Sequence, residues 1–238
     1  MYITYRPRLF LLSGMATAPN FMDTFGEQLC RRLEAKGFRP EYRLLFPYGD
    51  WSRRAAAQML EIYRDLRLRP QAAMRSIGGR RAAKEILSVC EDGLSVLIGH
   101  SGGGVAGVQA AELLRPALSL PGILTVQIGS PKCPVSPGGR ERALYIRGIG
   151  AKGGDPIARL GSWGGWVTGG SGLRDRLRYD RFKHAPAYRI NLALTGGHPD
   201  YFRGHEPFVN PDGRTNLQIV ADYTTAWLLE RWGSENGA

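Results

Sequence analysis

Hydrophobic positions along the chain fall into two patterns, short apolar runs and longer stretches with helical spacing. Each apolar run stops at a Gly, Pro or polar residue, as expected for a strand that is buried in a parallel sheet. These runs predict six strands, at residues 9–12, 42–46, 94–98, 123–128, 143–146 and 188–194.

The stretches between the strands have the periodicity of helices. In the first of them, apolar residues recur three or four positions apart, at Met22, Phe25, Leu29 and Leu33. In the second, the same spacing predicts that Met59, Ile62, Tyr63 and Leu66 share one buried face. Similar patterns predict helices at residues 20–36, 52–68, 79–91, 102–114 and 215–232.

Strands that alternate with helices favour a parallel sheet with helices on both faces. We therefore expect an α/β fold of three layers, α/β/α, with a mostly parallel sheet of about six or more strands. A length of 238 residues suits one such domain, and no internal repeat or linker divides residues 1–238.

One stretch, residues 148–172, interrupts this regular pattern. It holds ten of the 32 glycines together with Trp163 and Trp166, and it appears too rich in Gly for a regular element. Two interpretations stay open. Residues 157–186 form a lid or binding loop, or the segment is a surface loop whose tryptophans pack against the body of the protein.

The strongest chemical signal is Gly99-His100-Ser101-Gly102-Gly103, which lies between an apolar strand and a helix rich in small residues. The pattern G-x-S-x-G at such a junction is typical of a tight turn that exposes a nucleophilic serine, here Ser101. The residues that would let the helix lie close to the sheet are Gly104, Ala106, Gly107 and Ala110. The alternative is a structural serine in a tight turn.

The same glycines also match a second pattern, the dinucleotide-binding G-x-G-x-x-G, through Gly102, Gly104 and Gly107. Such a site needs an acidic residue near the end of the following strand, to bind the ribose. That strand continues through residues 127–131 without an acid. The sequence therefore favours the nucleophile and indicates no dinucleotide cofactor.

The turn at residues 99–103, which we call the elbow, and the order of the elements resemble those of the α/β-hydrolase superfamily over nearly the whole chain. The resemblance implies a catalytic triad in the order serine, acid, histidine, with the acid and the histidine after later strands. Asp155, after the fifth strand, fits the acid, although it could instead cap a helix. Asp175 and Asp180 are the alternatives, within an Arg-rich segment.

His198 fits the base, because Gly196-Gly197-His198-Pro199-Asp200 follows the last strand directly. His205 is the second candidate, seven residues on. His184 precedes the last strand and so belongs at the wrong end of the sheet, and the side chain of His100 must point away from the serine hydroxyl at the elbow. The resemblance implies an oxyanion hole from the backbone N–H groups of Gly102 and of Met15, or alternatively Ala16.

The resemblance further implies hydrolysis of a carboxylic ester through an acyl-enzyme intermediate, as in lipases and esterases. Only residues 129–142 connect the fourth and fifth strands, so we expect no cap domain there. We expect Trp163, Trp166 and Tyr201 to bind an apolar acyl group. The alternatives are a thioesterase or acyltransferase with the same triad, or a noncatalytic binding protein that retains the fold.

The pattern indicates no metal site, because His198, Asp200 and His205 lack the spacing of known zinc motifs.

The formal net charge of +11 comes mainly from arginines that are scattered along the chain. That distribution gives no reason to expect nucleic-acid binding, although a weak association with anionic membrane surfaces remains compatible with it. The three cysteines and the short apolar segment after Arg8 favour a cytoplasmic protein with neither disulfides nor a signal peptide. The sequence gives no indication of an oligomeric state.

Overall fold

The computed structural model describes residues 6–89, 94–116, 123–150, 154–168 and 177–235. Its centre is a six-stranded sheet in which every neighbouring pair is parallel, in the order β2-β1-β3-β4-β5-β8. The strands are β1 (Arg8–Leu12), β2 (Glu41–Leu45), β3 (Ser95–His100), β4 (Leu124–Ile128), β5 (Ala143–Ile149) and β8 (Tyr188–Ala193). The predicted α/β class and parallel sheet are confirmed.

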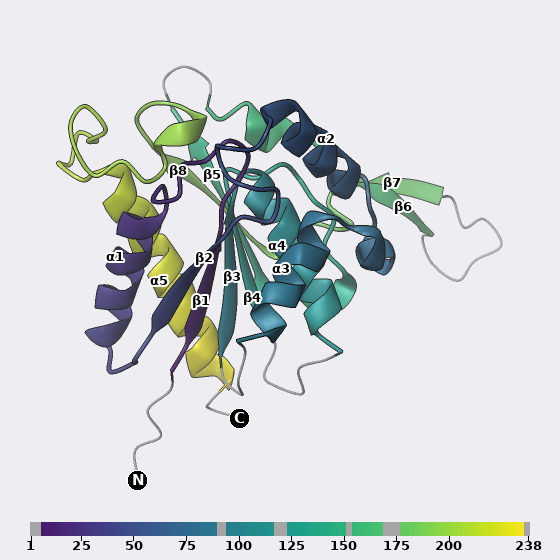
Figure 1. The fold of residues 1–238 in the computed structure, drawn as a ribbon, viewed down its shortest axis with the longest axis horizontal. Helices are drawn as coiled ribbons and strands as arrows, with labels where there is room; N and C mark the ends of the chain where they lie inside the picture. The colour runs from purple at the N-terminus through teal and green to yellow at the C-terminus, as the bar shows by residue number, and fades with distance from the viewer. Residues whose placement is uncertain (1–5, 90–93, 117–122, 151–153, 169–176, 236–238) are drawn as a thin grey trace, which may run out of the picture.

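Helices cover both faces of this sheet (Figure 1). One face packs against α1 (Asp23–Glu34) and α5 (Asn216–Glu235), and the other against α3 (Gly78–Leu87) and α4 (Gly102–Leu114), with α2 (Ala55–Leu66) beside α4. The alternation of side chains along a strand divides the core, so that Leu9 and Leu11 face α1 while Phe10 and Leu12 face α4.

The buried face of α2 differs from the predicted one. Met59 and Tyr63 are 58% and 54% exposed, whereas Gln58 and Asp65 are buried. The Asp65 carboxylate accepts hydrogen bonds from the Tyr48 hydroxyl and from the backbone N–H groups of Ile77 and Gly78, at the start of α3. The first N–H groups of a helix have no hydrogen-bond partner within that helix. Asp65 is buried because its carboxylate is the acceptor for these groups at the start of α3.

The glycine-rich segment is more regular than expected. After a short 3₁₀ helix at Ile157–Arg159, β6 (Gly165–Thr168) and β7 (Leu177–Asp180) form an antiparallel pair that extends from the side of the molecule (Figure 1). Trp166 lies opposite Tyr179 in this pair, and their rings meet edge to face at 5.4 Å. The expectation of no regular element was wrong, because cross-strand pairing of this kind stabilises even a strand that begins with Gly.

The strand order reverses its direction between β1 and β3. From β1 the chain passes through α1 to β2 on one side, and it then returns through α2 and α3 to β3 on the other side of β1. Ligands of open α/β sheets bind outside the carboxyl ends of the strands at such a reversal. The reversal lies between β1 and β3, where Ser101 follows β3.

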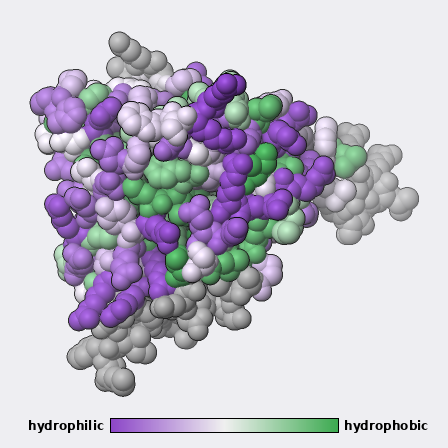
Figure 2. Space-filling model, viewed as in Figure 1, coloured by the Kyte–Doolittle hydropathy of each residue, from purple (hydrophilic) through white to green (hydrophobic). Residues whose placement is uncertain are grey.

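The surface seen in Figure 2 is mostly hydrophilic, with smaller groups of hydrophobic residues between the polar ones. Within the described part of the chain, no helix is both long and apolar enough to cross a bilayer.

The start of α4 touches the sheet backbone directly, which requires glycine. A Cβ atom at Gly103 would lie 1.9 Å from the carbonyl oxygen of Leu12, and one at Gly99 would lie 2.3 Å from the Gly103 backbone. Gly107, one turn further along, has room, because the nearest atoms to its Cβ position are 3.9 Å away. The elbow therefore depends on glycine at positions 99 and 103, and not at 107.

These distances predict opposite effects for two similar substitutions in one helix. Gly103→Ala should lower the free energy of unfolding by at least about 2 kcal/mol, since backbone must move to relieve the overlap. Gly107→Ala should raise it by roughly 0.5–1 kcal/mol, because Ala favours the helix and meets only ordinary contacts. Urea denaturation of both variants measures the difference, and equal effects would contradict the steric interpretation.

Candidate active site

Ser101 occupies the turn between β3 and α4, with φ of 56° and ψ of −128°. A positive φ is rare for a residue with a side chain, and it is maintained here by the contacts of the flanking glycines. The Ser101 N–H donates to the carbonyl of Ile128, at the end of β4. The backbone thus fixes Ser101 at the carboxyl edge of the sheet.

His198 and Asp155 meet this serine from two other loops. The Ser101 Oγ lies 2.9 Å from His198 Nε2, and His198 Nδ1 lies 2.8 Å from Asp155 Oδ2. Asp155 follows β5, and His198 begins a short 3₁₀ helix, His198–Asp200, after β8. The structure therefore brings together the three residues that the sequence analysis selected.

The Asp155 carboxyl group is buried among hydrogen-bond donors. Its Oδ2 accepts from the Tyr201 hydroxyl at 2.9 Å, and its Oδ1 accepts from the Ile157 N–H at 2.8 Å. Burial opposes ionisation, but the hydrogen bonds and charge interaction with His198, together with these donors, lower the pKa of Asp155 below its ordinary value. An ionised Asp155 only accepts, so Nδ1 of His198 carries the proton and Nε2 is the acceptor for the serine hydroxyl.

His100, within the elbow motif, contacts both the backbone and the ring of His198. Its Nε2 lies 3.1 Å from the His198 carbonyl oxygen and therefore donates to it, and the two imidazole rings stack at 4.8 Å. Burial, followed by the nearby His198, lowers the pKa of His100 to about 3. His100 is thus a neutral packing and positioning residue.

The loop after β1 lies directly against the serine. A Cβ atom at Gly14 would be 2.7 Å from the Cβ of Ser101, which places the backbone of Gly14 beside the Ser101 side chain. The Ala16 N–H is already engaged by the buried Gln58 side chain, at 3.0 Å from its Oε1. Of the two candidates in this loop, Met15 therefore fits an oxyanion hole with Gly102 better than Ala16.

The structure shows the contacts of the three residues that are expected to bind substrate, Trp163, Trp166 and Tyr201. Trp163 is 5% exposed, packs edge to face on Tyr145 and donates from Nε1 to the Cys133 carbonyl. Trp166 is 62% exposed on β6, in contact with Tyr179. Tyr201 is buried and binds Asp155. The structure therefore gives Trp163 and Tyr201 structural contacts in place of the expected acyl contacts.

Those alternative acids and bases that the structure describes do not join this cluster. His205 is exposed and pairs with the carbonyl of Glu206, while His184 follows the β6–β7 pair. Asp180 accepts the N–H of Phe182 at the end of β7. Asp175 lies outside the described residues.

Sequence reasoning missed the roles of Tyr201, His100 and Gln58. The available signal for Tyr201 was its position three residues after His198, because side chains three apart in a 3₁₀ helix share one face. Gln58 gave no signal, since its partners, the Ala16 N–H and the carbonyls of Asp50 and Arg53, come together only in the fold.

Within the described residues, no group of three or more His, Cys, Asp or Glu side chains could hold a metal ion. No protein-family model matches the chain, and no curated protein sequence matches it. The geometry of the site and the fold therefore carry the functional argument.

The neutral, buried His100 predicts a pH dependence of stability. Its pKa is about 3 in the folded protein and about 6.5 when unfolded, so the unfolded state binds the extra proton between these values. Stability should therefore fall as the pH drops from about 6.5 towards 3, with up to about 1.4 kcal/mol per pH unit from this residue.

In His100→Asn, urea denaturation should show a shallower loss of stability over this range than in the unmodified protein. His205→Asn, at an exposed histidine, is the matched control and should retain the original pH dependence. An unchanged slope in His100→Asn would contradict the assignment of a neutral His100.

Proposed function

We propose that this protein is a serine hydrolase of the α/β-hydrolase class, which cleaves a carboxylic ester through an acyl-enzyme intermediate. One observation carries the proposal, the continuous hydrogen-bonded series from Ser101 Oγ to His198 to Asp155, at 2.9 and 2.8 Å. A serine, a histidine and a buried carboxylate in this order are the groups that a serine nucleophile needs.

In the proposed reaction, His198 Nε2 removes the proton from the Ser101 hydroxyl as its oxygen attacks the ester carbonyl carbon. Asp155 keeps the imidazole in the tautomer that accepts this proton, and it stabilises the imidazolium that results. The protonated His198 then donates to the leaving alcohol, and an acyl group remains on Ser101. Water, deprotonated by His198, cleaves this acyl-enzyme and regenerates the serine.

The negative charge on the tetrahedral intermediate would be stabilised by backbone N–H groups. Those of Met15 and Gly102 flank the serine, and Gly102 is also the first residue of α4. The positive end of a helix dipole and its free N–H groups favour such a charge. A donor of this kind typically contributes on the order of 10²–10³-fold in rate.

The position in the fold supports the same function. Ser101 and Met15 follow β3 and β1, the two strands at which the direction of the sheet order reverses. That reversal is the general ligand site of open α/β sheets, so a substrate has access to the nucleophile there.

A fluorophosphonate probe, which phosphonylates activated serines, tests the nucleophile. The unmodified protein should become labelled, while Ser101→Ala and His198→Ala should lose labelling and should lose on the order of 10⁴-fold or more in turnover of p-nitrophenyl acyl esters. His205→Ala is the matched control and should keep both. Labelling that persists in Ser101→Ala would overturn the proposal.

The role of Asp155 is tested by Asp155→Asn. An amide beside Nδ1 can donate a hydrogen bond, which favours the wrong imidazole tautomer, so kcat for ester hydrolysis should fall by roughly 10⁴-fold at neutral pH. Asp180→Asn, at the alternative acid, should leave kcat within about twofold. A normal kcat in Asp155→Asn would exclude it as the acid.

An acyl panel that compares oxygen esters with thioesters of the same chain length separates the proposed esterase from a thioesterase. Absence of both labelling and turnover of either class would favour the noncatalytic alternative.

A further inference from the structure

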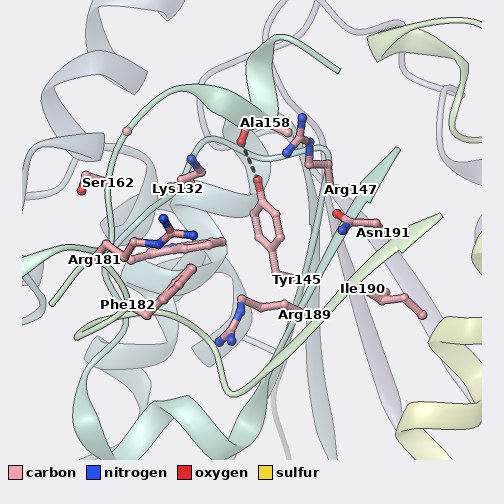
Figure 3. A pocket seen from close by; sticks show the side chains of 12 residues that line it. Lys132, Tyr145, Arg147, Ala158, Ser162, Arg181, Phe182, Arg189, Ile190 and Asn191 are labelled. Atoms are coloured by element: carbon pink, nitrogen blue, oxygen red, sulfur yellow. Dashed lines mark hydrogen bonds between the residues drawn. The ribbon is translucent and has the colours of Figure 1, made fainter. Parts of the chain in front are cut away.

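A cavity that does not include the serine lies on the face of β5 and β8. Its volume is about 670 Å³, and Figure 3 shows the side chains that line it. Within the described residues, none of the α-helices lines the cavity, and the wall opposite the sheet is formed by Ala158, the stretch from Gly161 to Trp163, and Arg181 with Phe182. None of Ser101, Asp155 and His198 lines it.

Four cationic side chains surround this cavity. Arg147 on β5 and Arg189 on β8 lie on the same face of the sheet, because the strand register pairs Arg189 with Tyr145 and Arg147 with Asn191. Lys132 comes from the loop after β4, and Arg181 from the turn after β7. Figure 3 shows these residues approaching from the two sides of Tyr145.

Among the described residues, these positive charges have no matching negative charges. None of the 12 residues that line the cavity is Asp or Glu, and no salt bridge to these four side chains is present within the described residues. Their contacts are with aromatic rings and carbonyls, since Arg181 and Arg189 lie 4.7 and 5.0 Å from the Phe182 ring centre and Lys132 lies 5.8 Å from that of Trp163.

Arg147 contributes a partly buried positive charge to the cavity. It is half-buried, and its Nε is buried with no hydrogen-bond partner within the described residues. A guanidinium that is partly removed from water is stabilised when an anion accepts hydrogen bonds from its accessible N–H groups, so Arg147 favours an anionic ligand in this cavity.

The positive surroundings extend beyond the cavity. An adjoining cavity shares Gly161 and Ser162 and includes His184. Burial, followed by the charges of Lys183, Arg69 and Arg140, lowers the pKa of His184. A neighbouring imidazole thus responds to a positive potential in this part of the molecule.

We propose that this cavity binds a small molecule that carries phosphate groups. A diphosphate concentrates several negative charges on compact oxygens, which accept from guanidinium and ammonium donors at once. Lys132 and Arg147, both half-buried, would bind at the base, while the more exposed Arg181 and Arg189 would bind at the rim.

Tyr145 lines this cavity, whereas Ser101, His198 and Asp155 do not. The buried Tyr145 hydroxyl lies 2.6 Å from the Ser130 carbonyl oxygen and 3.0 Å from that of Ala158, which ties the loops after β4 and β5 together. Phosphate binding is therefore independent of Ser101, and Ser101→Ala should bind as the unmodified protein does.

Isothermal titration calorimetry with sodium pyrophosphate, at fixed ionic strength, tests the proposal on the whole chain. The unmodified protein and Ser101→Ala should bind with equal affinity. Lys132→Gln and Arg147→Gln should each weaken binding by tenfold or more, and so should Arg181→Gln, which lies at the exposed rim and keeps the test valid if a half-buried variant fails to fold.

Arg43→Gln is the matched control, because it removes the same charge from an exposed arginine on β2, at the opposite edge of the sheet. It should leave the affinity for pyrophosphate unchanged. Absent binding, or equal weakening by Arg43→Gln, would overturn the proposal, and tighter binding of citrate than of pyrophosphate would overturn the assignment to phosphate.

Discussion

The close approach of α4 to the end of β1 is the constraint on which the rest of this structure depends. The backbone at Gly103 lies so near the Leu12 carbonyl that a single methyl group would overlap it. This approach maintains the positive φ of Ser101, starts a helix beneath its side chain and places Gly14 beside it. One backbone contact thus sets the conformation of the proposed nucleophile and the position of both backbone donors in the proposed oxyanion hole.

A buried charge then organises the loops after β5 and β8. The Asp155 carboxylate is removed from water, which is costly unless donors replace the lost hydration. His198, Tyr201 and Ile157 supply them, and the Tyr201 hydroxyl also accepts from the Gly148 N–H. Since His100 holds the His198 backbone from the other side, imidazole and carboxylate are fixed before any substrate arrives. Such preorganisation is what the proposed acyl transfer requires.

Along the face of the sheet that packs against α4, the side chains change from apolar to charged between the central strands and β8. Where α2, α3 and α4 cover the sheet, its strands carry apolar side chains, and the polar Asp65 is satisfied by helix N–H groups. Towards β8, none of the described α-helices lines that face, and arginines occupy strand positions that face the cavity. The same strand alternation therefore gives an apolar core in one place and the proposed phosphate cavity in another.

The sequence by itself determined the parallel sheet and the five helices, because buried strands and helix faces have distinct apolar periods that depend only on local order. It also pointed to Ser101 through the G-x-S-x-G junction, and to Asp155 and His198 through the triad order that the resemblance to α/β-hydrolases implies. Tertiary structure alone decided the partners of Gln58, Tyr201 and Trp163, which come from segments distant along the chain. It likewise decided that Met59 and Tyr63 face outward and that Arg147 and Arg189 share one cavity. Periodicity shows which residues can lie on a common face, but what lies opposite that face depends on how distant elements pack.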